Sequence, residues 1–202
     1  MKPYPEIIEH YKGDPVLYAA ISGLDLEIKP ELDIDIYASL LNSIVSQQLS
    51  IKVVRIIWRR FTDLFPGGYP EANQLLMTDH RILRRVGLSN SKANYLKNVA
   101  EFSLSHDMSF DYLHTLTDEE IISYLTQIKG VGRWTVQMIL MFPMDRPNVF
   151  PVDDLGIQNV MKDLYGLDLD RKALRQRLIE IADRWDPYRS LASKYLWEIG
   201  GI

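Results

Sequence analysis

The stretch LTQIKGVGRWTVQMIL, residues 125–140, places Gly-Val-Gly between two apolar segments. On both sides of the glycines, apolar side chains recur every three to four residues, which is typical of amphipathic helices. Two glycines separated by one residue let the backbone turn tightly and approach another surface closely. The stretch therefore predicts two helices joined by a hairpin, the second running from about Arg133 to Phe142.

The hairpin is suited to binding an anion. Its second helix begins at the turn, so the first N–H groups and the positive end of the helix dipole are directed at whatever lies beyond. A DNA phosphate is such an anion. The alternative is a plain helix connection with a glycine C-cap, which a lone Gly-x-Gly would favour. The apolar helix before the turn and the RWT after it, residues 133–135, make the pattern more specific.

The rest of the chain is also periodic in the way of helices. Apolar positions recur through residues 36–65 until Pro-Gly-Gly at 66–68 ends the run. Thr78 and Ser89 are expected N-caps, and Thr117 with Glu120 three residues later predicts a capping box. Further helical segments are expected from Asp154 to Gly166, in 170–185 and in 190–200. We therefore expect an all-α fold with two helical lobes, one of about 40–115 and one formed by the N-terminus with about 116–202.

Composition limits the classes of protein to consider. The chain has 202 residues, of which 47% are hydrophobic and 25% charged, as in globular proteins. It contains no Cys, which excludes disulfides, an iron–sulfur cluster and a Cys-ligated zinc site. No apolar run is long enough for a transmembrane helix. The net charge of −4 counts against nucleic-acid binding, although RIIWRR (55–60) and RILRR (81–85) are locally basic. Either basic run can equally be a solvated helix face.

A second decisive stretch is FPVDDLGI, residues 150–157, with two adjacent acids. Neighbouring side chains cannot both point into one site. An Asp directly before a helix is a good N-cap, so one of the pair can cap the helix while the other reacts. A carboxylate also suits a reaction that develops positive charge on a sugar, as glycoside cleavage does.

These two stretches together resemble the helix-hairpin-helix superfamily of DNA glycosylases, with its Gly/Pro-rich loop and Asp. Within it, the chain resembles the alkylpurine branch, the 3-methyladenine DNA glycosylase II type in its short single-module form. Three more stretches agree: SIVSQQLSIK (43–52), VGLSNSKANYL (86–96) and WDPYRSLASKYLW (185–197). The resemblance implies a cleft between the two lobes that holds the active site.

The resemblance also implies a catalytic acid. In the family, an apolar core residue follows the catalytic Asp by three positions, which selects Asp154 with Ile157 over Asp153 with Gly156. Bifunctional relatives carry a nucleophilic Lys two residues after the second hairpin glycine. This chain has Trp134 there. The implied enzyme is therefore a hydrolytic N-glycosylase of base excision repair without AP-lyase activity, which flips out 3-methyladenine or 7-methylguanine.

Other side chains receive roles from the same resemblance. Trp134 and Trp197 match the family's pocket tryptophans, and Met138 and Leu155 stand where longer relatives carry aromatic residues. Cation–π attraction to such faces selects for positively charged bases. The expected DNA contacts are Gly130, Val131, Gly132 and Arg133 of the hairpin, Gln48 as a gap-filling amide and Asn90 as a short wedge.

No cofactor is expected beyond a monovalent cation, Na⁺ or K⁺, on the carbonyls of Thr126, Ile128 and Val131. The expected partner is double-stranded DNA with alkylated bases. No membrane partner is expected, and the chain is expected to be a monomer. The expected location is the cytoplasm with the nucleoid, or the nucleus in a eukaryote. Two alternatives remain open: a helix-hairpin-helix module that binds DNA without catalysis, and a glycosylase for another base lesion.

Overall fold

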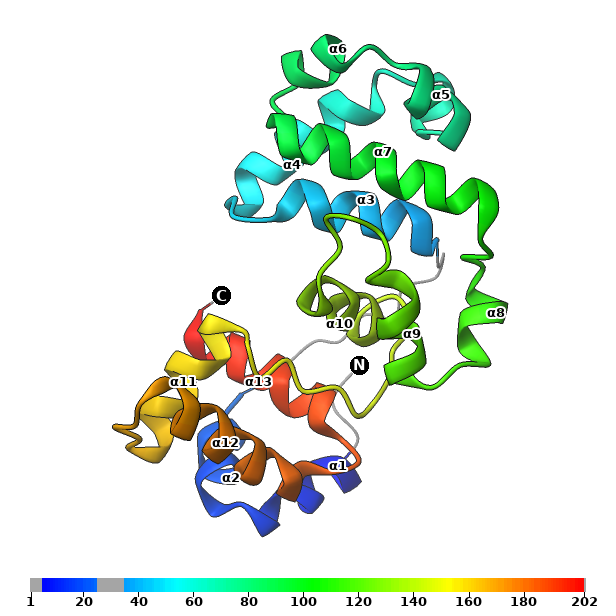
Figure 1. Cartoon of the computed structure of the whole chain (residues 1–202). Coiled ribbons are helices and arrows are strands. Elements are labelled where there is room, and N and C mark those ends of the chain that lie inside the picture. Colours follow the sequence, from blue (N-terminus) through cyan, green and yellow to red (C-terminus); the bar gives the residue numbers. More distant parts are fainter. Residues whose placement is uncertain (1–4, 25–34, 202) are drawn as a thin grey trace. The chain divides into compact units, whose positions relative to one another are not determined.

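A computed structural model of the chain describes residues 5–24 and 35–201. These residues form α-helices, short 3₁₀ turns and connecting loops, and the described part contains no β-strand (Figure 1). The all-α prediction is therefore confirmed. None of the helices in this part of the chain combines the length and apolarity that crossing a membrane requires.

The chain divides into two compact units. The middle unit is Asp33–Met144, and the terminal unit combines Met1–Leu32 with Asp145–Ile202. From the sequence we expect this division near residue 116, whereas the structure places it after Met144. The difference arises because the helix that follows the hairpin packs on the first helix of the middle unit, a long-range contact that periodicity does not reveal.

The middle unit contains eight α-helices among its described residues. They are α3 (Ile36–Ser46), α4 (Ile51–Thr62), α5 (Ala72–Met77), α6 (His80–Arg85), α7 (Asn90–Ser105), α8 (Phe110–His114), α9 (Asp118–Leu125) and α10 (Arg133–Met141). The periodic run 36–65 is interrupted at residues 47–50, where the chain leaves α3 and starts α4. Helix α7 packs against α3 and α5, and α10 packs against α3 and α9.

Local capping signals account for most helix starts in this unit. The capping box is confirmed, because the Glu120 N–H donates to Thr117 Oγ1 at 3.3 Å and the Thr117 N–H donates to Glu120 Oε2 at 2.8 Å. The prediction for Thr78 was wrong. Asp79 caps α6 by accepting the Arg81 N–H at 2.7 Å, and the Thr78 hydroxyl instead donates to the Gln74 carbonyl. A carboxylate one residue later is the stronger acceptor.

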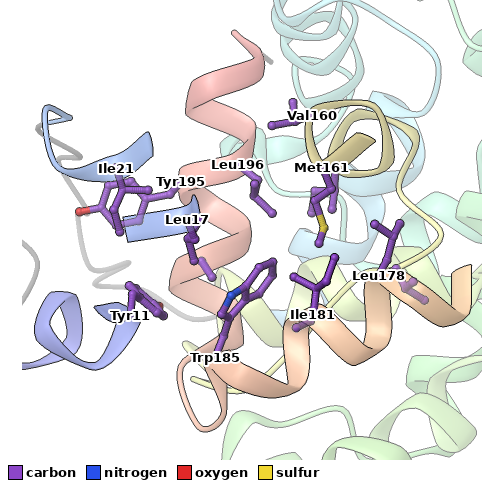
Figure 2. Close-up of a cluster of buried hydrophobic side chains, with 14 of the residues drawn as sticks. Tyr11, Leu17, Ile21, Val160, Met161, Leu178, Ile181, Trp185, Tyr195 and Leu196 are labelled. Carbon is purple, nitrogen blue, oxygen red and sulfur yellow. The ribbon is translucent and has the colours of Figure 1, made fainter. Parts of the chain in front are cut away.

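The terminal unit combines both ends of the described chain. Its helices are α1 (Pro5–His10), α2 (Pro15–Ile21), α11 (Leu155–Tyr165), α12 (Arg171–Ala182) and α13 (Arg189–Gly200), with 3₁₀ turns at Tyr11–Gly13 and Asp183–Trp185. Figure 2 shows buried side chains of α2, α11, α12, α13 and both 3₁₀ turns meeting in one core, Leu17 and Ile21 among them. Helix α11 has the predicted extent, since it is capped by Asp154 and ends at Gly166 in the left-handed region.

A buried carboxylate joins the two ends within this unit. Asp14, which is 1% exposed, caps α2 by accepting the N–H groups of Val16 and Leu17. Its other oxygen accepts the Tyr165 hydroxyl at 2.7 Å and the Trp185 indole N–H at 3.0 Å. Burying a charge is costly unless hydrogen bonds compensate, and four donors do so here. Hydrogen bonding and burial both raise the pKa of Tyr165, with burial the larger cause.

We predict that Asp14→Ala lowers the free energy of unfolding by about 3 kcal/mol or more, because it removes a cap and leaves buried donors without an acceptor. Asp170→Ala is the matched control, since Asp170 caps α12 through two N–H groups at an exposed position. That variant is expected to lose about 1 kcal/mol. Urea denaturation of both variants measures the difference, and equal losses would contradict the special role of Asp14.

Candidate functional site

The candidate catalytic acid lies at the start of α11. The Asp154 N–H donates to the Pro151 carbonyl at 2.9 Å, which forms the turn before the helix. Asp154 Oδ1 then accepts the Ile157 N–H at 2.9 Å and the Trp197 indole N–H at 3.2 Å. The carboxylate therefore lies at the positive end of the helix dipole, which attracts negative charge. The side chain is half-buried.

The neighbouring acid has a different environment. Asp153 is exposed, and its Oδ1 accepts from Arg175 Nε of α12 at 3.0 Å. Sequence reasoning left open which acid caps the helix. The structure assigns the cap to Asp154 and an exposed ion pair to Asp153. Such a pair contributes little to stability.

Two apolar side chains of the predicted pocket accompany Asp154 in the terminal unit. Trp197 of α13 packs partly on the core of this unit while its indole N–H reaches the carboxylate. Leu155, the first residue of α11, is 73% exposed although it is apolar. Tyr195, by contrast, lies in the core at 1% exposed (Figure 2). The structure thus brings Asp154 and Trp197 into contact and keeps Tyr195 away from solvent.

The hairpin belongs to the middle unit and connects α9 to α10. Gly130 has φ +105°, and a Cβ there would lie 2.2 Å from Cγ of Tyr95 on α7. Gly132 is the N-cap of α10, and a Cβ there would meet nothing within 4 Å. The two glycines therefore serve different purposes. Gly130 permits the hairpin to lie directly on α7, whereas Gly132 leaves open space before the helix N-terminus.

The first turn of α10 carries the other predicted hairpin residues. No side chain caps this helix at Gly132. Arg133 donates to both carboxylate oxygens of Glu119 on α9, and this pairing holds the pKa of Glu119 below its usual range. Trp134 is 39% exposed, and Met138 lies partly buried one turn later. Sequence reasoning missed Glu119, which offers no signal beyond its place in an acidic first turn.

The predicted gap-filling and wedge residues are both exposed. Gln48 lies in the loop between α3 and α4 with φ +59°, a left-handed conformation that is uncommon outside glycine. Asn90 is the first residue of α7, and Ser89 caps that helix as predicted, accepting the Lys92 N–H at 3.2 Å. The ammonium of Lys92 donates to two carbonyls at the end of α3. Sequence reasoning assigned Lys92 no role.

The three carbonyls predicted to hold a cation belong to the turn between α9 and α10. Thr126 is the C-cap of α9, and the Ile128 carbonyl accepts the Val131 N–H at 3.0 Å. A carbonyl oxygen has two lone pairs, so this bond leaves capacity for a cation. Elsewhere, the described residues include no cluster of three His, Cys, Asp or Glu side chains able to hold a metal ion.

Comparison with known proteins places the chain in a family. The family described as the HhH-GPD superfamily base excision DNA repair protein matches residues 41–184. DNA-3-methyladenine glycosylase 1 of Schizosaccharomyces pombe is 35% identical over 164 residues, which are 80% of this chain and 71% of the relative. A Bacillus subtilis relative with a DNA-3-methyladenine glycosylase name is 33% identical over 172 residues. That match spans 82% of this chain but only 59% of the relative.

A solved structure is also similar over nearly the whole chain. It is a 3-methyladenine DNA glycosylase of Schizosaccharomyces pombe in complex with abasic DNA, 30% identical, with a TM-score of 0.80. The similarity covers 96% of this chain and 95% of that one. The match extends the likeness from sequence motifs to the path of the backbone.

We predict that the hairpin glycines respond differently to Ala. Gly130→Ala should lower the free energy of unfolding by about 2–3 kcal/mol, because of the positive φ and the clash with Tyr95. Gly132→Ala should cost about 0.5–1 kcal/mol as a poorer N-cap. It should nevertheless weaken binding to undamaged duplex DNA several-fold, because a methyl group would separate the helix N-terminus from a phosphate. Urea denaturation measures the loss of stability, and fluorescence anisotropy measures DNA binding. A Gly130→Ala protein as stable as wild type would refute the close packing of Gly130 on Tyr95.

Proposed function

Because this chain belongs to the HhH-GPD superfamily of base excision DNA repair proteins, we propose that it is a monofunctional DNA glycosylase that removes alkylated purines from duplex DNA. The observation that carries the proposal is the Asp154 carboxylate, held by a helix N-terminus and by the Trp197 indole beside the exposed Leu155. Relatives named as DNA-3-methyladenine glycosylases support the lesion class. The proposed substrates are 3-methyladenine and 7-methylguanine.

The proposed reaction is hydrolysis of the N-glycosidic bond. The bond between C1′ and the base nitrogen breaks, its electron pair leaves with the base, and positive charge develops on the sugar. The Asp154 carboxylate stabilises that charge. A water oxygen then bonds to C1′ and gives up its proton, either to Asp154 or to solvent. An alkylated purine already carries positive charge, so it leaves without a general acid.

Aromatic faces select the base. Trp197 of the terminal unit stacks on the extrahelical purine, and cation–π attraction favours its charged, alkylated form by roughly 1–2 kcal/mol. Leu155 adds an apolar contact in place of a further aromatic ring. The partial exposure of Trp134 and the half-buried position of Trp197 are consistent with faces that a ligand can cover.

The hairpin holds the DNA backbone. The N–H groups at the start of α10 bind a phosphate. Arg133 leaves its partner Glu119 and contacts the backbone of the same DNA strand. Gln48 fills the gap left by the flipped base, and Asn90 contacts its flank. A monovalent cation on the carbonyls of Thr126, Ile128 and Val131 would add positive charge near that phosphate. The protein acts as a monomer and requires no other cofactor.

We predict that Asp154→Asn reduces single-turnover release of methylpurines from methylated duplex DNA by about 100-fold or more. Asparagine is also a good N-cap, so the free energy of unfolding of the variant should lie within about 1 kcal/mol of the wild-type value. Asp153→Asn is the matched control and should retain wild-type activity. If wild type binds the DNA but frees no base, the chain is a binding module, and if it frees only another lesion, the substrate class is wrong.

We also predict hydrolysis without strand cleavage. Trp134 has no amine and cannot form a Schiff base with C1′. Incubation with lesion-containing duplex and borohydride should therefore trap no covalent protein–DNA complex, and the abasic product should stay intact until alkali is added. A trapped adduct would overturn the monofunctional assignment.

A further inference from the structure

One helix contacts both of the middle unit's proposed DNA-binding elements. Helix α7 presents Lys92, Tyr95 and Asn98, spaced by three residues, toward its neighbours. Lys92 Nζ donates to the carbonyls of Val45 at 2.8 Å and Gln47 at 2.7 Å, at the end of α3. The Asn98 side chain donates to the Lys129 carbonyl at 2.8 Å, in the hairpin.

The hairpin end of this arrangement is tightly fitted. Gly130 lies so close to the Tyr95 ring that an added Cβ would force the ring or the backbone to shift, and the adjacent carbonyl of Lys129 is held by Asn98. These two contacts therefore fix the position of the hairpin along α7. From Lys92 to Asn98 the helix rises by about 9 Å, which sets the distance along α7 between its two sets of contacts.

The loop end depends on Lys92. The last carbonyls of a helix lack intrahelical partners and carry partial negative charge. An ammonium group can donate hydrogen bonds to these carbonyls, and its positive charge is attracted to them. The Gln47 carbonyl and the Gln48 N–H belong to one planar peptide group. Fixing the direction of that carbonyl therefore fixes the plane from which Gln48 begins. Gln48 has φ +59°, a conformation that a non-glycine residue keeps only when its surroundings impose it.

A second link ties the loop to the hairpin helix. The Gln47 side-chain amide lies 3.5 Å from the hydroxyl of Thr135, which is buried in the first turn of α10. The backbone of Gln47 is thus held by α7 while its side chain reaches α10. The loop and the hairpin are positioned by the same set of contacts.

We propose that Lys92 is a positioning residue that holds Gln48 in its left-handed conformation. It thereby fixes the position of the gap-filling side chain relative to the hairpin, measured along α7. This inference rests on the proposed function, since it concerns the DNA site of that function. It gives α7 the role of a spacer between the phosphate-binding turn and the side chain that replaces the flipped base.

The chain supplies a matched control for a purely structural role. Lys97, on the same helix, donates to the carbonyls of Leu76 at 2.9 Å and Thr78 at 2.7 Å, at the end of α5. Lys92 and Lys97 are both partly buried, and each closes the end of a neighbouring helix in the same way. Lys97 touches neither the loop of Gln48 nor the hairpin in any described contact.

The experiment compares Lys92→Met, Lys97→Met and Lys92→Arg in the full chain. Binding is measured to an undamaged duplex and to a duplex with a tetrahydrofuran abasic-site analogue flanked by 2-aminopurine, whose fluorescence reports filling of the gap. Neither readout requires base release. Lys92→Met should lose about tenfold of the preference for the abasic duplex, together with the fluorescence change. Binding of both Met variants to undamaged duplex should stay within about twofold of wild type.

Lys97→Met should keep the preference for the abasic duplex, although urea denaturation should show that it is destabilised as much as Lys92→Met. Lys92→Arg, which retains a cation that can donate to both carbonyls, should restore most of the preference. The inference is overturned if Lys92→Met keeps the preference, or if both Met variants lose it equally. If wild type shows no preference and also frees no base, the proposed function fails together with this inference.

Discussion

A buried carboxylate, that of Asp14, is the interaction on which the terminal unit depends. It joins a helix near the start of the chain to Tyr165 and Trp185 near its end, and Trp185 is also part of the buried core shown in Figure 2. The same core supports α11 and α13, which carry Asp154 and Trp197. The site is therefore built on a framework whose two halves are distant in sequence and are joined by hydrogen bonds to one side chain.

Asp154, the proposed catalytic acid, also has a structural role. As an N-cap it satisfies a backbone N–H that would otherwise lack a partner, at the positive end of the helix dipole. Both properties suit a group that stabilises a developing cation. The indole of Trp197 fixes the orientation further. The site thus obtains a preorganised anion from the ordinary requirements of starting a helix, while the neighbouring Asp153 pairs with Arg175 in solvent.

Features governed by local chemistry were predictable from sequence. The capping box at Thr117, the Ser89 cap and the extent of α11 follow from side chains that act within one turn. The prediction that Thr78 caps a helix was wrong because Asp79, a stronger acceptor, follows it directly. The unit boundary differed because packing of α10 on α3 is long-range. The contacts of Lys92 went unnoticed because their acceptors are backbone carbonyls, which no side-chain pattern reveals. The choice of Asp154 came from family resemblance, and its contact with Trp197 came only from the structure.

The terminal unit is interrupted by the whole middle unit, and this has a consequence for synthesis. A ribosome releases residues 33–144 after α1 and α2 but before α11 and α13 exist. The middle unit therefore has all its residues while the nascent chain is still growing, and it can fold at that stage. The core partners of Leu17 and Ile21 become available only after α11, α12 and α13 have been synthesised. During that interval the apolar side chains of α2 lack the partners that bury them in the folded protein.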